Sequence, residues 1–148
     1  RTFSKAHGMA GARIGYAVAD KEIIAALDKI RNHFGVNRVA QAGALASLAD
    51  RAFVLSVVKQ VEEGKRAYAA LARELGIEMI PSATNFVALD IGSGERARAL
   101  LQALLARDVF VRMPGVAPLD RCIRLTVGPA TERKVFAEIL REVLPQVG

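Results

Sequence analysis

Side chains that could do chemistry gather at the start of the sequence, where residues 4–16 read Ser-Lys-Ala-His-Gly-Met-Ala-Gly-Ala-Arg-Ile-Gly-Tyr. The amine of Lys5 can bond covalently to the carbon of a carbonyl group. Arg13 offers a planar fork of N–H donors, which suits a phosphate better than the point charge of a lysine does. Ser4 adds a hydroxyl donor, and the glycines let the backbone come close to a ligand. The segment therefore predicts a loop that binds a phosphate and presents a reactive amine.

Two further arginines stand beside apolar runs in the second half of the chain. Arg112 directly follows Val109-Phe110-Val111, and Arg124 lies inside Cys122-Ile123-Arg124-Leu125-Thr126-Val127-Gly128. The alternation of strand side chains alone favours a solvent-facing arginine in each case. Asn85 opens another apolar run, and a purely structural role at the start of a strand is as good an explanation for it as a functional role.

The pattern Ser-Lys-Ala-x-Gly-x-Ala-Gly-x-Arg-x-Gly-Tyr of residues 4–16 resembles the lysine segment of the class I/II, fold type I, pyridoxal-phosphate-dependent aminotransferases. The likeness is strongest to the histidinol-phosphate aminotransferase group. This resemblance implies that Lys5 is catalytic and holds the cofactor pyridoxal 5'-phosphate, while Ser4 and Arg13 bind the cofactor's phosphate.

The resemblance extends to the arginines of the second half. Arg124 matches an arginine that receives the α-carboxylate of the substrate in this family, within an Ile/Leu-Arg-Leu/Ile-Thr-Val-Gly context. Arg112 matches a second arginine, which helps to hold the anionic end of the substrate. Asn85, in Ser82-Ala83-Thr84-Asn85-Phe86, matches a motif near the substrate. We therefore expect these three residues to bind substrate.

The function that the resemblance implies is transamination between an amino acid or amino-alcohol phosphate, of the histidinol-phosphate or aromatic type, and 2-oxoglutarate. Three alternatives stay open: a pyridoxal-phosphate-dependent decarboxylase of the same subfamily, the aminotransferase-like sensor domain of a DNA-binding regulator, and a non-catalytic binding domain. Family active sites draw residues from two subunits, so a homodimer is also implied.

Composition is that of an ordinary globular chain, with 148 residues of which 52% are hydrophobic and 24% charged. The net charge of +6 raises nucleic acid as a partner, but basic and acidic residues alternate, as in residues 59–66, and no basic block occurs. The single cysteine, Cys122, and the absence of a long apolar run favour a cytoplasmic protein that contacts no membrane. His7 and His33 lack partners at metal-ligand spacing, so no metal site is predicted. His7 is left either to contact the cofactor region or to pack.

The fold class expected is α/β, with residues 1–50 ending a large cofactor domain built on a mostly parallel sheet. Ile14 to Ala19 is too continuously apolar for a half-exposed strand and predicts a buried one. Asp20 then predicts the N-cap of a helix with Ile23, Ile24, Leu27 and Ile30 on one face. After a loop over residues 32–37, a helix rich in small residues runs from Val39 to Asp50.

Residues 51–148 are expected to form a small α+β domain, entered through a long helix that reaches Leu75 and bends at Gly64. Strands are predicted over residues 77–80, 85–91, 109–111 and 122–127. A helix after Gly94 is expected to bury Leu100, Leu101, Leu104 and Leu105. A final helix is expected to be capped by Thr131 and to bury Val135, Phe136, Ile139, Leu140 and Val143.

The chain begins with Arg1 inside the motif loop, while members of the resembled family are well over twice as long. We therefore expect a piece of a longer protein. The family also needs an aspartate for the pyridine nitrogen, an aromatic residue that stacks on the ring and a Gly-rich helix start under the phosphate. Since these have no counterpart here, the piece by itself is expected to be inactive.

Overall fold

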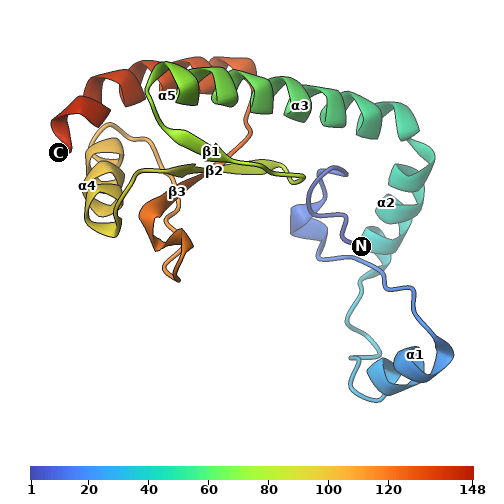
Figure 1. Cartoon of the computed structure of the whole chain (residues 1–148). Coiled ribbons are helices and arrows are strands. Elements are labelled where there is room, and N and C mark those ends of the chain that lie inside the picture. The colour runs from blue at the N-terminus through green and yellow to red at the C-terminus, as the bar shows by residue number, and fades with distance from the viewer. The chain divides into compact units, whose positions relative to one another are not determined.

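The computed structural model describes all 148 residues, which separate into two compact units, Arg1–Val58 and Lys59–Gly148 (Figure 1). Each unit is described by itself below. The predicted domain boundary near residue 51 lies eight positions before this division, at the start of the helix α3 (Arg51–Glu74), and it stays a prediction.

The first unit is mainly helical, with the 3₁₀ turn η1 (Ala10–Ala12), the helices α1 (Lys21–Asp28) and α2 (Arg38–Ala49), and the beginning of α3. The predicted small-residue helix is confirmed as α2. The side chain of Asn37 caps it by accepting a hydrogen bond from the Ala40 N–H over 2.7 Å. Ala40 and Ala44 are the buried members of its small-residue stripe.

The strand predicted over residues 14–19 is wrong. Only Gly15 pairs, in an isolated antiparallel bridge with Thr2, and the side chains of Tyr16 and Val18 are 48% and 87% exposed. A strand exists through hydrogen bonds to a neighbouring strand, and the residues of this chain that run beside the segment are Arg1 to Phe3 alone. The apolar sequence therefore stays extended and uncovered.

The apolar face of α1 is exposed in this unit. The helix begins after Asp20 as expected, but the Asp20 side chain accepts no capping hydrogen bond. Ile23, Leu27 and Ile30 are exposed, because no element of this unit covers them. The helical periodicity predicted the helix correctly, but it does not show whether another element covers the apolar face.

The second unit contains a three-stranded antiparallel sheet in the order β1 (Glu78–Ile80), β2 (Phe86–Asp90) and β3 (Cys122–Thr126). Three of the four predicted strands are thus confirmed. The register pairs Ala88 with Arg124 and Phe86 with Thr126. Because side chains alternate along a strand, these four residues share one face of the sheet.

The fourth predicted strand, residues 109–111, does not form. The N–H of Val109 bonds to the Leu104 C=O over 3.0 Å, and Asp108 takes a left-handed conformation with φ of 58°, so this stretch ends a helix. Only the next residue, Arg112, pairs with the sheet, in a bridge with Arg124. Local capping at the helix end has overridden the strand preference of the apolar run.

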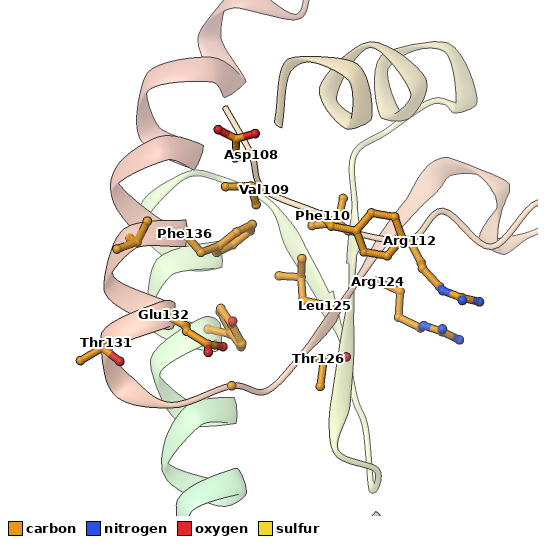
Figure 2. A pocket seen from close by; sticks show the side chains of 14 residues that line it. Asp108, Val109, Phe110, Arg112, Arg124, Leu125, Thr126, Thr131, Glu132 and Phe136 are labelled. Atoms are coloured by element: carbon orange, nitrogen blue, oxygen red, sulfur yellow. The ribbon is translucent and has the colours of Figure 1, made fainter. Parts of the chain in front are cut away.

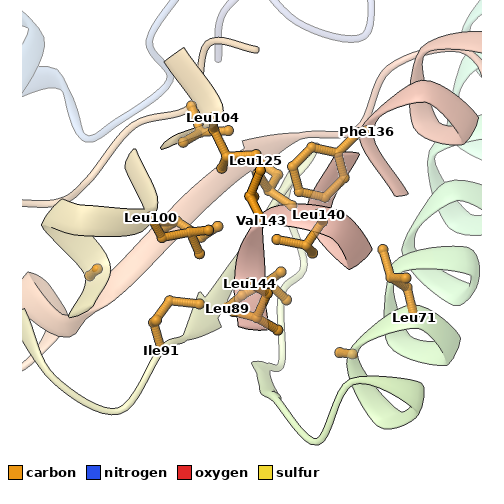
Figure 3. Packing of buried hydrophobic residues seen from close by; sticks show 14 of the residues in the cluster. Leu71, Leu89, Ile91, Leu100, Leu104, Leu125, Phe136, Leu140, Val143 and Leu144 are labelled. Carbon is orange, nitrogen blue, oxygen red and sulfur yellow. The ribbon is translucent and has the colours of Figure 1, made fainter. Parts of the chain in front are cut away.

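Three helices cover the other face of the sheet: α3, α4 (Gly94–Leu105) and α5 (Ala130–Val143), with α3 and α5 side by side (Figure 1). They bury one continuous hydrophobic cluster, shown in Figure 3. Val87 and Leu89 from β2 and Ile123 and Leu125 from β3 form its sheet side. The short 3₁₀ turns η2 (Leu119–Arg121) and η3 (Leu144–Gln146) complete the unit.

Several side chains of the small domain differ from expectation. Leu105 and Val135 are each 52% exposed and lie at the edges of their helical faces rather than within them. Thr131 lies inside the first turn of α5, because Pro129, with its fixed φ, occupies the N-cap position.

Gly64 marks a close contact and not a bend. The helix α3 passes through it without interruption, and a Cβ atom at this position would collide with Val127 Cγ1. The glycine lets the end of β3 approach the helix backbone.

No single helix is long and apolar enough to cross a membrane, and only α2 and α3 taken together, bent by 77° at their junction, reach that length and composition.

Candidate functional site

The motif loop of the first unit closes on itself through its backbone. The Phe3 N–H donates to the Ile14 C=O over 3.2 Å, next to the bridge between Thr2 and Gly15. The Phe3 C=O accepts the Met9 N–H over 2.9 Å, so the pairing ends at Phe3 and Ile14. Ser4 and Arg13, the two predicted phosphate-binding residues, are nine positions apart along the chain and directly flank this pairing.

Lys5 lies beside this pair with an exposed side chain. Its C=O accepts a hydrogen bond from the Gly8 N–H over 2.8 Å, in a tight turn where Gly8 takes φ of 68°. Arg13 also has a left-handed backbone, with φ of 52°, and its Nη1 donates to the Ala10 C=O over 2.7 Å. The remaining guanidinium donors and the Ser4 hydroxyl suit a phosphate, and the free amine of Lys5 suits an aldehyde. The residues present therefore fit pyridoxal phosphate.

His7 packs within the same unit. Its Nδ1 is 2.7 Å from the Ser47 hydroxyl oxygen, and its ring lies 4.7 Å from the Phe3 ring between centroids. Of the two possibilities left open by the sequence, the structure shows a packing contact that ties the motif loop to α2.

In the second unit the structure brings Arg112 and Arg124 together. Each donates its backbone N–H to the other's C=O, over 3.1 Å from Arg112 and 2.6 Å from Arg124. Two residues that exchange both hydrogen bonds in this way stand directly opposite one another, with side chains on the same face. Figure 2 shows both side chains extending in the same direction, away from Phe136 and Glu132.

Neither guanidinium has an acidic partner. The five ion pairs of the structure involve other residues, and the Arg124 guanidinium carbon lies 4.9 Å from the centroid of the Phe86 ring. Like charges directly opposite in a sheet repel one another. Their retention without a counter-charge is typical of a site for an anion.

A hollow of about 550 Å³ opens between β3, residues 108–112 and α5, and both arginines line it (Figure 2). Its other walls carry the aromatic side chains of Tyr68, Phe110 and Phe136. Burial raises the pKa of Tyr68, so its hydroxyl stays protonated at neutral pH. The two guanidinium groups extend from one end of the hollow, whereas Tyr68 and Phe136 belong to the buried cluster on the other side of the sheet (Figure 2).

Asn85 lies at the end of the sheet, where its C=O accepts the Val127 N–H over 2.9 Å. Its backbone therefore joins β2 to the end of β3, while its role toward substrate stays a prediction. A functional role for the neighbouring Phe86 was not predicted from the sequence. Only the pairing of β2 with β3, which joins residues far apart in sequence, puts it against Arg124.

The two predicted groups lie in different units: Ser4, Lys5 and Arg13 in the first, and Arg112, Arg124 and Asn85 in the second. The structure pairs Arg112 with Arg124, while Lys5 and Arg13 each bond to other residues of the motif loop. The roles assigned to all six residues stay predictions.

Comparison with known proteins points to one family. The chain is 41% identical over 144 residues to the histidinol-phosphate aminotransferase of Akkermansia muciniphila, an alignment that covers 97% of this chain and 39% of that protein. It also resembles the crystal structure of histidinol-phosphate aminotransferase from Sinorhizobium meliloti in complex with pyridoxal-5'-phosphate. That likeness has a TM-score of 0.93 and 44% identity, over 100% of this chain and 41% of the other.

A third similar protein is the L-threonine-O-3-phosphate decarboxylase of Porphyromonas gingivalis, with a TM-score of 0.79 and 28% identity over 97% of this chain and 45% of that one. The chain thus spans about two fifths of the length of its relatives. The family model for aminotransferase class I and II matches residues 1–143, and the chain belongs to that family.

Proposed function

We propose that the protein to which this chain contributes is a pyridoxal-phosphate-dependent aminotransferase. It would transfer an amino group between an amino acid or amino-alcohol phosphate, of the histidinol-phosphate or aromatic type, and 2-oxoglutarate. The observation that carries the proposal is the bridge that sets Arg112 opposite Arg124 with no acidic side chain to neutralise either. Substrates of this reaction bring the carboxylate or phosphate groups that such a pair binds.

The first unit supplies the cofactor-binding residues. Ser4 and Arg13 would hold the phosphate of the cofactor, and Lys5 would hold its aldehyde carbon through the side-chain amine. When bound, pyridoxal phosphate supplies the electron sink for the substrate α-carbon. Displaced by the substrate amine, Lys5 would then move a proton at the α-carbon, first as a base and then as an acid.

The second unit supplies the substrate-binding residues. Arg124 would bind the α-carboxylate with its forked donors, as its match to the family motif implies. Arg112, one step across the bridge, would bind the other anionic end of the substrate. Asn85, which directly precedes Phe86 at the end of the sheet, would also contact the substrate. Each arginine would thus bind a different anionic group of the same substrate, which explains why two arginines lie next to each other.

Decarboxylation is the second candidate, favoured by the similarity to the L-threonine-O-3-phosphate decarboxylase. Such a reaction also needs a phosphate-binding and a carboxylate-binding group on the substrate side. The two reactions differ in which bond to the α-carbon breaks, and the products therefore separate them: carbon dioxide for one, a keto compound for the other.

The test is the visible absorption spectrum of the full-length protein with pyridoxal phosphate, for wild type, Lys5→Ala and the control Lys21→Ala. Lys21 is an exposed lysine at the start of α1. We expect a band of the bound cofactor that requires Lys5, survives in the control and bleaches on addition of an amino donor. A folded full-length protein without any lysine-dependent band would overturn the proposal.

A homodimer and a cytoplasmic location belong to the same proposal. Both are supported by membership of a family of biosynthetic enzymes, and size-exclusion chromatography with light scattering on the full-length protein would test the first.

A further inference from the structure

The guanidinium of Arg124 lies over the face of the Phe86 ring, with 4.9 Å between the guanidinium carbon and the ring centroid. The sheet register produces this contact. Phe86 pairs with Thr126 and Ala88 pairs with Arg124, so Phe86 and Arg124 are diagonal neighbours on the face that the helices leave uncovered. A cation at this distance is attracted by the negative face of the ring.

This contact leaves the N–H donors of the Arg124 guanidinium free to bind an anion. Attraction to a ring face uses the charge of the guanidinium and none of its N–H donors, so a carboxylate can still accept two of them. Arg124 makes no side-chain hydrogen bond or ion pair in the structure, so its donors remain available. Repulsion from the opposite Arg112 would otherwise favour rotamers that separate the two charges.

The backbone of Phe86 is itself held by a cluster of hydroxyl groups. Ser82 Oγ and Thr84 Oγ1 both donate to the Phe86 C=O, over 2.6 and 3.1 Å, and the Phe86 N–H donates back to Thr84 Oγ1 over 3.3 Å. Lys65 of α3 anchors the turn by donating to the Ser82 C=O over 3.1 Å. The ring therefore starts from a fixed backbone rather than from a mobile loop.

From these contacts we infer that Phe86 is a positioning residue for anion binding, whose ring holds the Arg124 guanidinium ready to receive a substrate carboxylate. The inference rests on the proposed function, because it assigns Phe86 to the substrate site that Arg124 would form. Phe86 acts through Arg124, without a required contact of its own with the substrate.

The experiment measures the binding of succinate, a dicarboxylate without an amino group, to the full-length protein loaded with cofactor. Isothermal titration would compare wild type, Phe86→Leu, Phe86→Tyr and the control Phe34→Leu, which removes a ring that is 95% exposed in the first unit. We expect Phe86→Leu to weaken succinate roughly 2- to 10-fold, and Phe86→Tyr and the control to bind as wild type does.

A double-mutant cycle separates positioning from general damage. In an Arg124→Gln background the change Phe86→Leu should weaken succinate no further, since the guanidinium that the ring holds is gone. In turnover, Phe86→Leu should raise the KM for glutamate and leave kcat within about twofold. Equal weakening in both backgrounds, or unchanged affinity in Phe86→Leu, would overturn the inference.

The two failures are distinguishable. If the wild-type protein shows no absorption band that depends on Lys5, the proposed function is rejected. A normal band together with a Phe86→Leu variant that binds succinate normally would reject only the positioning role.

Discussion

Arg112 and Arg124 exchange two backbone hydrogen bonds, of 3.1 and 2.6 Å, and so present two uncompensated positive charges side by side on one face of the sheet. Their backbones are held by these hydrogen bonds, while neither side chain forms an ion pair. The two like charges repel one another, and a bound anion would relieve that repulsion.

The first prediction concerns this balance between stability and binding. Arg112→Gln keeps a long polar side chain and removes one of the two charges. The free energy of unfolding of the cofactor-free, full-length protein should then stay the same or rise, by at most about 1 kcal/mol. The affinity for phosphate-bearing amino donors should fall at the same time. Urea denaturation and substrate titration would measure the two effects.

Arg107→Gln is a suitable control, because Arg107 forms an ion pair with Glu142 over 2.7 Å, away from the hollow. It should leave substrate affinity unchanged. A clear loss of stability in Arg112→Gln would contradict the interpretation of the pair as a binding site held against repulsion.

The second prediction concerns Arg13. In Arg13→Gln the charge is lost but a hydrogen-bond donor remains, so the affinity for pyridoxal phosphate should drop about 10- to 100-fold, as expected for a charged hydrogen bond to phosphate. Titration of the full-length protein with the cofactor, followed by absorbance, measures the change. Lys29→Ala, at an exposed lysine after α1, should bind the cofactor normally. Equal affinities in all three proteins would remove Arg13 from the phosphate site.

The third prediction concerns Gly64. Alanine is the better helix former by about 1 kcal/mol, yet Gly64→Ala should destabilise the protein by roughly 1–3 kcal/mol because its Cβ collides with Val127 Cγ1. Thermal or urea unfolding measures the loss. The added change Val127→Ala should restore part of it, since it removes the colliding atom. If Gly64→Ala alone were stabilising, the contact between α3 and the end of β3 would not be the reason for the glycine.

Much of the second unit was predictable because its signals are local. Helical periodicity identified α4 and α5, although the predicted cap Thr131 was wrong, and short apolar runs bounded by turn residues identified β1, β2 and β3, each within a few residues. The strand at residues 109–111 failed for a local reason too, since the end of α4 uses the Val109 N–H. Residues 14–19 failed for a non-local one, because an apolar run becomes a strand only beside a partner strand.

The candidate site was predictable in its residues but not in its arrangement. The types and spacing of Lys5 and Arg13 were sufficient to propose a cofactor loop by resemblance. The opposition of Arg112 and Arg124, and the stacking of Arg124 on Phe86, depend on the register between segments far apart in sequence. The residue pattern within a single segment does not reveal how that segment pairs with another one.

The fourth prediction concerns the pH dependence of stability through Asp90. Burial raises the pKa of this carboxyl, but hydrogen bonds from Arg121 Nε over 2.7 Å and from the Gly92 N–H over 2.8 Å outweigh it and hold the pKa below its ordinary value of 3.8. A carboxyl with a lowered pKa stabilises the folded state above its ordinary pKa, and the contribution is lost as the pH falls through the folded-state value.

Asp90→Asn should therefore lower the urea midpoint at pH 7, and the gap to wild type should narrow between about pH 4 and the acid limit of folding. Asp20→Asn, at an exposed carboxylate without an ion pair, controls for the loss of one negative charge and should show no such convergence. A gap that stays constant down to pH 3 would mean that Asp90 acts through its shape and hydrogen bonds alone, with its charge making no contribution. The expected convergence would instead assign the stabilisation to the ion pair that joins the end of β2 to Arg121, next to the start of β3.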